Sequence, residues 1–303
     1  MPRPLRLGTR SSPLARWQAE WVAMQLEHLG TPVELVPITT KGDVTAGPLG
    51  SFGGQGVFTK ELQRSLLEGQ IDLAVHSLKD LPTMPVEQLV LAAVPHREAP
   101  GDALVSNMAN QLADLPERAR IGTGSPRRAA QLLHLRPDLR IRDIRGNVDT
   151  RLRKLDEGQY DALVLAEAGL RRLGRAMRIA EILPRDRVLP AVGQGALGLE
   201  TRRDDDATRS ALAPLNHPDT WAAVQAERAL LAHLRAGCLA PVGAWARVSG
   251  EKLVLDAVVL TPDGRSRLHT QYAGPMTEAS QVGIEAAEQL IAQGAAELIR
   301  SAS

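Results

Sequence analysis

The chain of 303 residues contains a single cysteine, Cys238. One thiol excludes an internal disulfide and a metal cluster built on cysteines. The seven histidines are scattered, and none pairs at the spacing of a helical metal site, so we expect no bound metal. Aromatic residues make up only 3% of the chain, which disfavours the stacking surfaces that single-stranded nucleic acids need.

Long apolar runs are also missing. No stretch approaches the ~20 residues that a membrane-spanning helix needs, and the first residues lack the hydrophobic region of a signal peptide. The net charge is only +1, which argues against a broad basic surface for nonspecific nucleic-acid binding. We therefore expect a globular cytoplasmic protein without membrane or nucleic-acid partners.

What the chain does have is one strongly basic segment. Residues 118–154 hold eleven arginines and lysines against three aspartates, a surplus of eight positive charges. Solvated helix faces are the ordinary explanation of such a run. In Gly122-Thr-Gly-Ser-Pro-Arg-Arg128, however, small residues follow an apolar strand and precede a helix, which places both arginines in the first turn. Exposed amides and the helix dipole favour an anion there, so the segment predicts an anionic ligand.

Apolar strands alternate with amphipathic helices, which predicts an α/β fold with parallel sheets. The first half suggests strands at 5–7, 33–39 and 71–75 and helices at 14–29 and 58–68. The second half repeats the pattern, with strands at 120–122, 139–144 and 161–166 and helices at 125–135 and 147–157. The last part predicts a small α+β domain, with helices at 220–234 and 278–299 and strands at 242–248, 253–260 and 266–272.

We expect three domains from this pattern. Residues 1–97 with 192–216 form the first α/β domain, residues 98–191 the second, and residues 217–303 the C-terminal α+β domain. The two α/β domains are expected to be similar to the lobes of periplasmic binding proteins. Six glycines between Gly42 and Gly56 predict a loop, which we expect to act as a lid that ligand orders.

Two residues are candidates for chemistry, each with an ordinary alternative. Asp80 follows a buried strand, where parallel sheets place their ligands, although an acid beside Lys79 is more often half of a surface ion pair. Cys238 follows Gly237 in a loop, where covalent chemistry is open to it, although a lone cysteine is more often a small buried hydrophobe.

Eight motifs in their order resemble the hydroxymethylbilane synthase family, also called porphobilinogen deaminase. The motifs are Thr9–Ala15, Gly53–Glu61, Val75–Pro82, Gly122–Arg128, Arg145–Leu152, Ala168–Gly174, Pro190–Gly195 and Gly237-Cys238. The resemblance spans nearly the whole chain. It implies a transferase that condenses four porphobilinogen molecules head to tail, releases ammonia at each addition, and hydrolyses off a linear tetrapyrrole. It also implies a monomer that carries a dipyrromethane cofactor on a cysteine thioether.

The resemblance assigns roles to individual residues of this chain. It makes Cys238 the covalent anchor of the dipyrromethane and Asp80 the catalytic carboxylate. The implied cofactor-binding residues are Ser77, Lys79, Thr123, Ser125, Arg127, Arg128 and Arg151. The implied substrate-binding residues are Arg10, Ser12, Phe58, Arg145, Arg172 and Gln194. The basic segment agrees with these roles, because porphobilinogen bears acetate and propionate groups that guanidinium forks suit.

The sequence departs from the family pattern at two places, and rival functions remain. Pro126 stands where a leucine is usual, and Gln55 where a lysine is frequent. Two α/β domains also suit a carboxylate-binding protein without catalysis, although the missing signal peptide and the third domain speak against it. An arginine-rich nucleic-acid binder is a further alternative, and it predicts affinity that falls steeply with salt.

Overall fold

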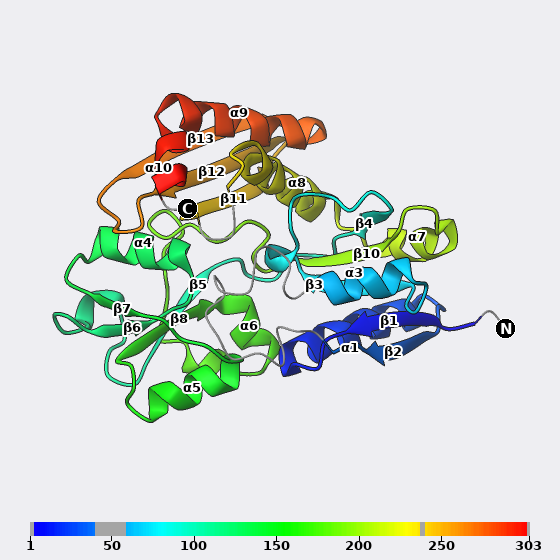
Figure 1. The fold of residues 1–303 in the computed structure, drawn as a ribbon, viewed down its shortest axis with the longest axis horizontal. Coiled ribbons are helices and arrows are strands. Elements are labelled where there is room, and N and C mark those ends of the chain that lie inside the picture. Colours follow the sequence, from blue (N-terminus) through cyan, green and yellow to red (C-terminus); the bar gives the residue numbers. More distant parts are fainter. Residues whose placement is uncertain (1–2, 40–58, 237–239, 302–303) are drawn as a thin grey trace. The chain divides into compact units, whose positions relative to one another are not determined.

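The computed structural model describes residues 3–39, 59–236 and 240–301. The chain forms two compact units, one of residues 1–97 with 196–221 and the other of residues 98–195 with 222–303 (Figure 1). The chain therefore leaves the first unit, returns to it once, and leaves it again. Among the described residues, no helix has the length and apolar character to cross a membrane.

The first unit is built on a five-stranded sheet with the order β2-β1-β3-β10-β4. Its strands are β1 (Leu5–Thr9), β2 (Val33–Pro37), β3 (Leu73–Ser77), β4 (Leu89–Ala93) and β10 (Leu197–Arg202). β1 runs parallel to β2 and β3, whereas β10 runs antiparallel to β3 and β4. The three parallel strands therefore end at one common edge.

Helices cover both faces of this sheet. α1 (Pro13–His28) and α7 (Asp206–Leu212) contribute to the core on one face, and α3 (Lys60–Leu67) to the core on the other. In β3, Leu73 and Val75 pack with α1, while Ala74 between them packs with α3. This alternation follows from the period of two in a strand, and it explains why β3 is apolar at every position from Leu73 to Val75.

The second unit begins with a sheet of the same design, in the order β7-β6-β8-β5-β9. Its strands are β5 (Asp102–Ser106), β6 (Arg120–Gly122), β7 (Arg140–Arg142), β8 (Ala162–Ala166) and β9 (Glu181–Ile182). β6 runs parallel to β7 and β8, and β5 runs antiparallel to β8. α4 (Pro126–Leu135) packs on one face, and α5 (Val148–Asp156) and α6 (Glu167–Arg172) pack on the other. The expected pair of similar α/β sheets is confirmed.

The chain's crossings explain the antiparallel strand of each sheet. β5 is the first strand after the chain enters the second unit, and β10 is the first strand after it returns to the first unit. Each of them begins where a parallel neighbour ends, since Asp102 pairs with Ala166 of β8 and Leu197 with Ser77 of β3. The first residues of both crossing strands therefore lie at the carboxyl edge of the parallel strands.

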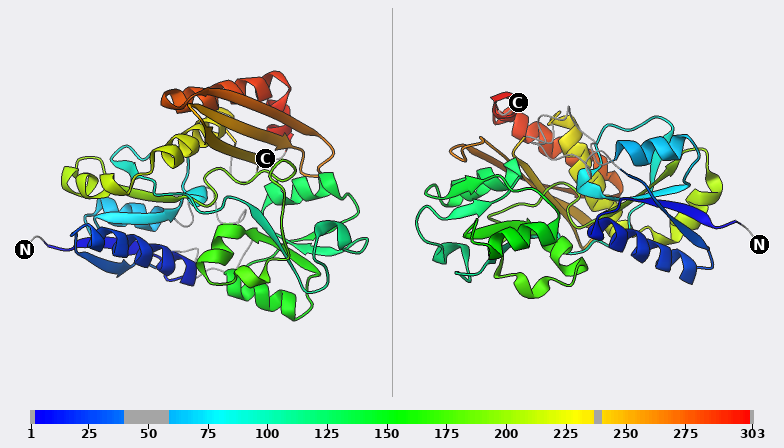
Figure 2. Two further views of the ribbon diagram at one scale, coloured as in Figure 1. Left: turned by 180° about the vertical axis from the view of Figure 1, so that it is seen from behind. Right: turned by 60° about the horizontal axis from the view of Figure 1, so that its bottom comes forward.

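The C-terminal part of the second unit is an antiparallel sheet with helices. β11 (Val242–Ser249), β12 (Lys252–Leu260) and β13 (Arg267–Pro275) form a meander, and α8 (Pro218–His233) and α9 (Ala279–Ala292) share its core (Figure 2). The small α+β domain expected from the sequence is thus confirmed as a sheet-and-helix fold. The chain clusters into two compact units. The finer division into three domains stays a prediction.

The sequence prediction of one final helix over residues 278–299 is wrong. The chain forms α9 and then α10 (Ala295–Ser301), with Gly294 between them. The φ angle of Gly294 is +102°, a left-handed conformation that ends a helix and that glycine adopts without a steric cost.

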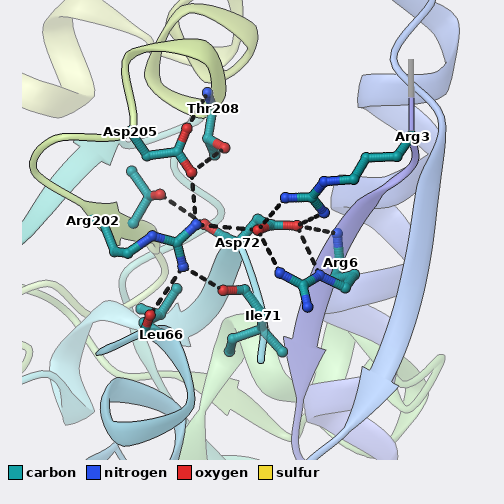
Figure 3. A network of polar contacts seen from close by, with 9 residues as sticks. Arg3, Arg6, Leu66, Ile71, Asp72, Arg202, Asp205 and Thr208 are labelled. Carbon is teal, nitrogen blue, oxygen red and sulfur yellow. Dashed lines mark hydrogen bonds and ion pairs between the residues drawn. The ribbon is translucent and has the colours of Figure 1, made fainter. Parts of the chain in front are cut away.

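A buried carboxylate organises the opposite, amino-terminal edge of the first sheet. Asp72 directly precedes β3, and its side chain is fully buried. It accepts hydrogen bonds from Arg3 Nη1 at 2.8 Å, Arg6 Nη2 at 2.9 Å and Arg202 Nη2 at 3.1 Å (Figure 3). Burial raises the pKa of Asp72, but these hydrogen bonds outweigh it and hold the pKa far below its ordinary value. The contacts join β1, β3 and β10.

We expect Asp72→Asn to destabilise the chain by about 3 kcal/mol at pH 7, because three arginines lose their common counter-charge. The folded pKa is depressed, so the contribution of Asp72 is complete above the unfolded pKa of about 4 and is lost as pH falls below it. Urea unfolding of wild type and variant at pH 7 and pH 3 checks this. An equal difference in stability at both pH values contradicts it.

Candidate functional site

Asp80 lies just beyond the carboxyl end of β3. After Ser77 the chain makes a short turn, η2 (Leu78–Asp80), in which Leu78 is buried and donates its N–H to the carbonyl of Ala196 at 3.0 Å. The next residue, Leu81, is buried as well. The side chains of Lys79 and Asp80 are exposed on this fixed turn. The backbone therefore holds the exposed side chain of Asp80 at this edge.

The other site residues of the first unit lie at the same edge. Ser77 ends β3, and its hydroxyl is 2.9 Å from Nε2 of Gln18 on α1. Arg10 and Ser12 lie in the connection from β1 to α1, and β1 is the parallel neighbour of β3. Ser12 is the N-cap of α1, because its Oγ accepts the N–H of Ala15. The sheet thus gathers five predicted residues at one edge of the first unit: Arg10, Ser12, Ser77, Lys79 and Asp80.

The second unit repeats this arrangement with more positive charge. Each of its three parallel strands is followed at its carboxyl end by predicted binding residues. Thr123, Ser125, Arg127 and Arg128 follow β6, Arg145 and Arg151 follow β7, and Arg172 follows β8 at the end of α6. Parallel neighbours end at the same edge of a sheet, so the topology brings these seven side chains to one side of the second unit.

Local structure fixes the start of α4. Ser125 is its N-cap and accepts the N–H of Arg128 at 3.4 Å, and Pro126 occupies the first turn, where proline needs no donor. Gly124 precedes the cap, and a Cβ there would lie 2.9 Å from Oδ1 of Asp143 and 3.2 Å from the carbonyl oxygen of Ile144. The departure at Pro126 is therefore compatible with a regular helix start, and the approach of the neighbouring chain requires the glycine.

Arg127 and Arg128 are almost completely buried, at 4% and 7% exposure. Both contact Asp102, the first residue of β5: Arg127 Nη1 is 2.6 Å from Oδ2, and Arg128 Nη2 is 2.7 Å from Oδ1. Burial raises the pKa of Asp102, but the two guanidinium charges outweigh it and hold this pKa well below its usual range. Burial lowers the pKa of Arg127, which the charge of Asp102 opposes.

The remaining arginines are less buried. Arg145 pairs with Asp143 at 3.0 Å, and Arg151 Nε donates to the carbonyl of Gly146 at 2.8 Å. Arg172 Nη2 donates to the carbonyl of Gly195 at 2.7 Å, and burial lowers its pKa to about 10 against the opposing charge of Glu98. At that pKa, Arg172 keeps its positive charge at neutral pH.

Gln194, predicted to bind substrate, is only 1% exposed. Its Nε2 donates to Oδ1 of Asp102 at 2.9 Å and to the carbonyl of Pro100 at 2.8 Å, and its Oε1 accepts from Arg128. The side chain is therefore in contact with the arginine cluster inside the protein. Cys238, Phe58, Gln55 and the loop from Gly42 to Gly56 lie outside the described residues, so their predicted roles stay predictions.

Sequence reasoning missed two buried carboxylates that contact residues of this cluster or its neighbouring turn, Asp102 and Glu227. Glu227 on α8 is fully buried and accepts the backbone N–H groups of Gly193 and Ala246. An acid beside an apolar stretch is an available signal for each of them, but the residues that Asp102 contacts are at least 25 positions away in the sequence. In the described ranges, no group of three histidine, cysteine or acidic side chains is placed to hold a metal ion.

The fold and the edge residues define a class of protein: two α/β sheets, of which the second gathers arginines at the carboxyl edge of its parallel strands and the first carries the exposed Asp80 at the same edge. Two family models match the chain. They are the dipyrromethane cofactor-binding domain of porphobilinogen deaminase over residues 5–210 and the C-terminal domain of porphobilinogen deaminase over residues 221–292.

Curated relatives agree with these matches. A porphobilinogen deaminase of Syntrophotalea carbinolica is 53% identical over 96% of this chain and 93% of its own length. One of Geobacter metallireducens is 49% identical over 98% and 94%. The chain belongs to the porphobilinogen deaminase family of transferases, and the resemblance found in its motifs is confirmed.

Solved structures of low sequence identity show a partial likeness of fold. A periplasmic substrate-binding protein of an ABC transporter from Coxiella burnetii has a TM-score of 0.46 and 16% identity, over 71% of this chain and 92% of its own. The methionine-binding protein MetQ has a TM-score of 0.45 and 16% identity, over 70% and 89%. No functional conclusion rests on them.

The cap at Ser125 gives a test of how the start of α4 is stabilised. We expect Ser125→Ala to lower the free energy of unfolding by about 1 kcal/mol, because α4 loses its cap. Ser125→Asp restores a capping oxygen and therefore the stability, yet adds negative charge where an anionic ligand is expected. Urea unfolding checks both, with Ser12→Ala as the matched loss of a cap in the first unit. Equal stability of wild type and both alanine variants contradicts the assignment.

Proposed function

We propose that this chain condenses four porphobilinogen molecules head to tail, with loss of ammonia at each addition, and releases the linear tetrapyrrole hydroxymethylbilane by hydrolysis. The observation that carries the proposal is the match of both family models over nearly the whole chain. Asp80 and the arginines that the family resemblance assigns are all present at carboxyl edges of parallel strands. Cys238 is the proposed attachment point of the dipyrromethane on which the product grows.

The arginine cluster of the second unit fits a cofactor that bears carboxylates. Arg127, Arg128 and Asp102 together leave one uncompensated positive charge in a buried place. The buried Nε–H of Arg127 has no hydrogen-bond partner within the part of the chain that the structure describes. Leaving a charge uncompensated inside a protein costs several kcal/mol, and an acetate or propionate group from a ligand supplies the missing negative charge.

We assign the binding groups to two sets. Ser77, Lys79, Thr123, Ser125, Arg127, Arg128 and Arg151 hold the dipyrromethane, and Arg10, Ser12, Phe58, Arg145, Arg172 and Gln194 act on the incoming or growing chain. When bound, the dipyrromethane supplies the terminal pyrrole carbon to which the first substrate ring is joined. Planar guanidinium forks suit this task because each can bind a carboxylate through two parallel hydrogen bonds.

Asp80 is the proposed catalytic residue. Loss of ammonia from porphobilinogen leaves a cationic pyrrole, and joining two rings creates a second cation that must lose a proton. A carboxylate close to the pyrrole nitrogens stabilises both positive charges and can accept that proton. The exposed side chain of Asp80 on a rigid turn suits this role, because its position is set by the buried Leu78 and Leu81.

We further propose that the protein acts as a cytoplasmic monomer whose partner is porphobilinogen, without nucleic acid or membrane. Family membership supports porphobilinogen as the substrate. Sedimentation of the purified protein with and without porphobilinogen tests the monomer, since an increase in mass to a dimer contradicts it.

The covalent cofactor gives the most direct test. The intact mass of freshly purified protein is expected to exceed the mass of the sequence by two linked pyrrole units. Cys238→Ser is expected to keep the fold, because the chain has no second cysteine and thus no internal disulfide to lose, but to lose both the added mass and turnover. An active protein with the bare mass overturns the anchor. A protein that binds porphobilinogen without turnover or adduct instead supports a carboxylate-binding protein.

Asp80→Asn tests the mechanism. The amide keeps the shape of the side chain but carries no charge, so we expect ring addition to slow by ~100- to 1,000-fold, or ~3 kcal/mol or more. Asp80→Glu is expected to retain part of the rate. Single-turnover ring addition is measured in protein whose mass shows that it carries cofactor. Asp204→Asn, an exposed acid in the same unit, serves as the control. Ring addition at the wild-type rate in Asp80→Asn refutes the proposed role.

A further inference from the structure

The topology of the second sheet brings an acid to the edge where its arginines gather. Asp102 is the first residue of β5, and β5 runs antiparallel to β8 with Asp102 opposite Ala166, the last residue of β8. β8 is the parallel neighbour of β6, whose carboxyl end leads into α4. Asp102 therefore lies beside the first turn of α4, although it is 25 residues away from Arg127 in the sequence.

Asp102 itself is closed off from any ligand. Its side chain has no exposed surface, and both carboxylate oxygens accept hydrogen bonds from protein groups. Oδ2 accepts from Arg127 Nη1 at 2.6 Å, and Oδ1 accepts from Arg128 Nε at 2.9 Å and from Gln194 Nε2 at 2.9 Å. Any effect of Asp102 on ligand binding is therefore exerted through the arginines.

Backbone carbonyl groups complete the support of both guanidiniums. Arg127 Nη1 also donates to the carbonyl of Leu189 at 2.6 Å, and Arg128 Nη1 to that of Val164 at 3.1 Å. Each guanidinium is thus fixed from at least two directions, which leaves it little rotational freedom. Pre-fixed groups lose less conformational entropy when a ligand binds, so this support increases affinity without touching the ligand.

We propose that Asp102 is a positioning residue, which orients Arg127 and Arg128 for the carboxylates of the dipyrromethane and keeps their charges from repelling each other. This proposal rests on the proposed function. One carboxylate between two cations leaves a net charge of +1, which still attracts an anion. Without Asp102 the two arginines would bury a net charge of +2. Loss of Asp102 is therefore expected to impair loading of Cys238 more than its effect on stability explains.

Gln194 extends the same support. Its amide bridges Asp102 and Arg128, and its Nε2 also donates to the carbonyl groups of Pro100 and Gly101 at 2.8 and 3.1 Å. With 1% of its surface exposed, Gln194 acts on ligands through Asp102 and Arg128. We therefore propose that Gln194, which the resemblance assigns to substrate binding, acts without direct contact by positioning Asp102 and Arg128.

The turn that carries Gln194 is tied to the helix that precedes the anchor. The N–H of Gly193 donates to Oε2 of Glu227 at 2.7 Å, and Oε1 of Glu227 accepts the N–H of Ala246 at 2.9 Å. Glu227 belongs to α8, which ends at His233, five residues before Cys238. One buried hydrogen-bond network therefore runs from the arginine pair through residues 193 and 194 to the helix that leads to the cysteine.

The experiment compares two buried aspartates. Asp102→Asn and Asp72→Asn each remove a fully buried carboxylate that neutralises several arginines, but only Asp102 lies at the binding edge. Each protein is purified, its folded fraction is measured by circular dichroism, and the fraction of folded molecules with an adduct on Cys238 is measured by intact mass. We expect loading to fall roughly tenfold or more in Asp102→Asn and to stay near wild type in Asp72→Asn.

A second pair of variants decides the matter if Asp102→Asn does not fold. Gln194→Leu removes the amide that bridges Asp102 and Arg128, whereas Thr201→Val removes an equally buried hydroxyl group of the first unit that donates to a backbone carbonyl. We expect loading to fall roughly threefold or more in the first and to stay unchanged in the second. Equal loading within either matched pair of folded proteins overturns the proposal. Absence of the adduct from active wild type overturns the covalent anchor instead.

Discussion

The arrangement of the second unit depends on one carboxylate between two guanidiniums. Like charges in adjacent residues of one helical turn repel, and burial removes the water that would screen them. Asp102 resolves this, because it accepts from both side chains while the strand pairing of β5 with β8 fixes its backbone. The cap at Ser125 fixes the other side, since it sets where α4 begins. Arginine geometry at this edge is therefore determined by the sheet, before any ligand is present.

Asp72 is also a buried carboxylate that pairs with arginines, but it lies at the amino-terminal edge of the first sheet, where the pairing has a different effect. It precedes β3 and neutralises Arg3, Arg6 and Arg202, of which Arg3 is largely exposed to solvent (Figure 3). α7 begins at that edge, but its N-cap Asp205 already places a carboxylate there, which accepts the N–H of Thr208 and pairs with Arg202. At the carboxyl edge of the second unit, the starts of α4 and α5 add to the positive charge of the arginines. An arginine cluster thus joins strands at one edge and favours an anion at the other.

Local signals in the sequence predicted most of the parallel core. The sequence predicted helices from residues 14 and 125, and α1 and α4 begin at Pro13 and Pro126, each after a serine cap. The strands β4, β5, β9 and β10 were not predicted from the sequence. The Asp102 cluster was hidden because its members are distant in the sequence. Its partners are separated by up to 92 residues, and it is the pairing of β5 with β8 that brings Asp102 to the start of α4.

The donor geometry of this cluster explains why arginine, and not lysine, suits the first turn of α4. Both side chains carry one positive charge, but a lysine offers three donors on one compact ammonium group, whereas an arginine offers five donors spread over a plane. Arg128 uses this spread, because it contacts Asp102, Gln194 and a backbone carbonyl together. Three fixed acceptors hold the guanidinium of Arg128 rigid. The Nε–H of Arg127 has no hydrogen-bond partner within the described part of the chain. A buried carboxylate and a rigid fork therefore give a cation that the fold tolerates and whose charge favours an anion at the start of α4.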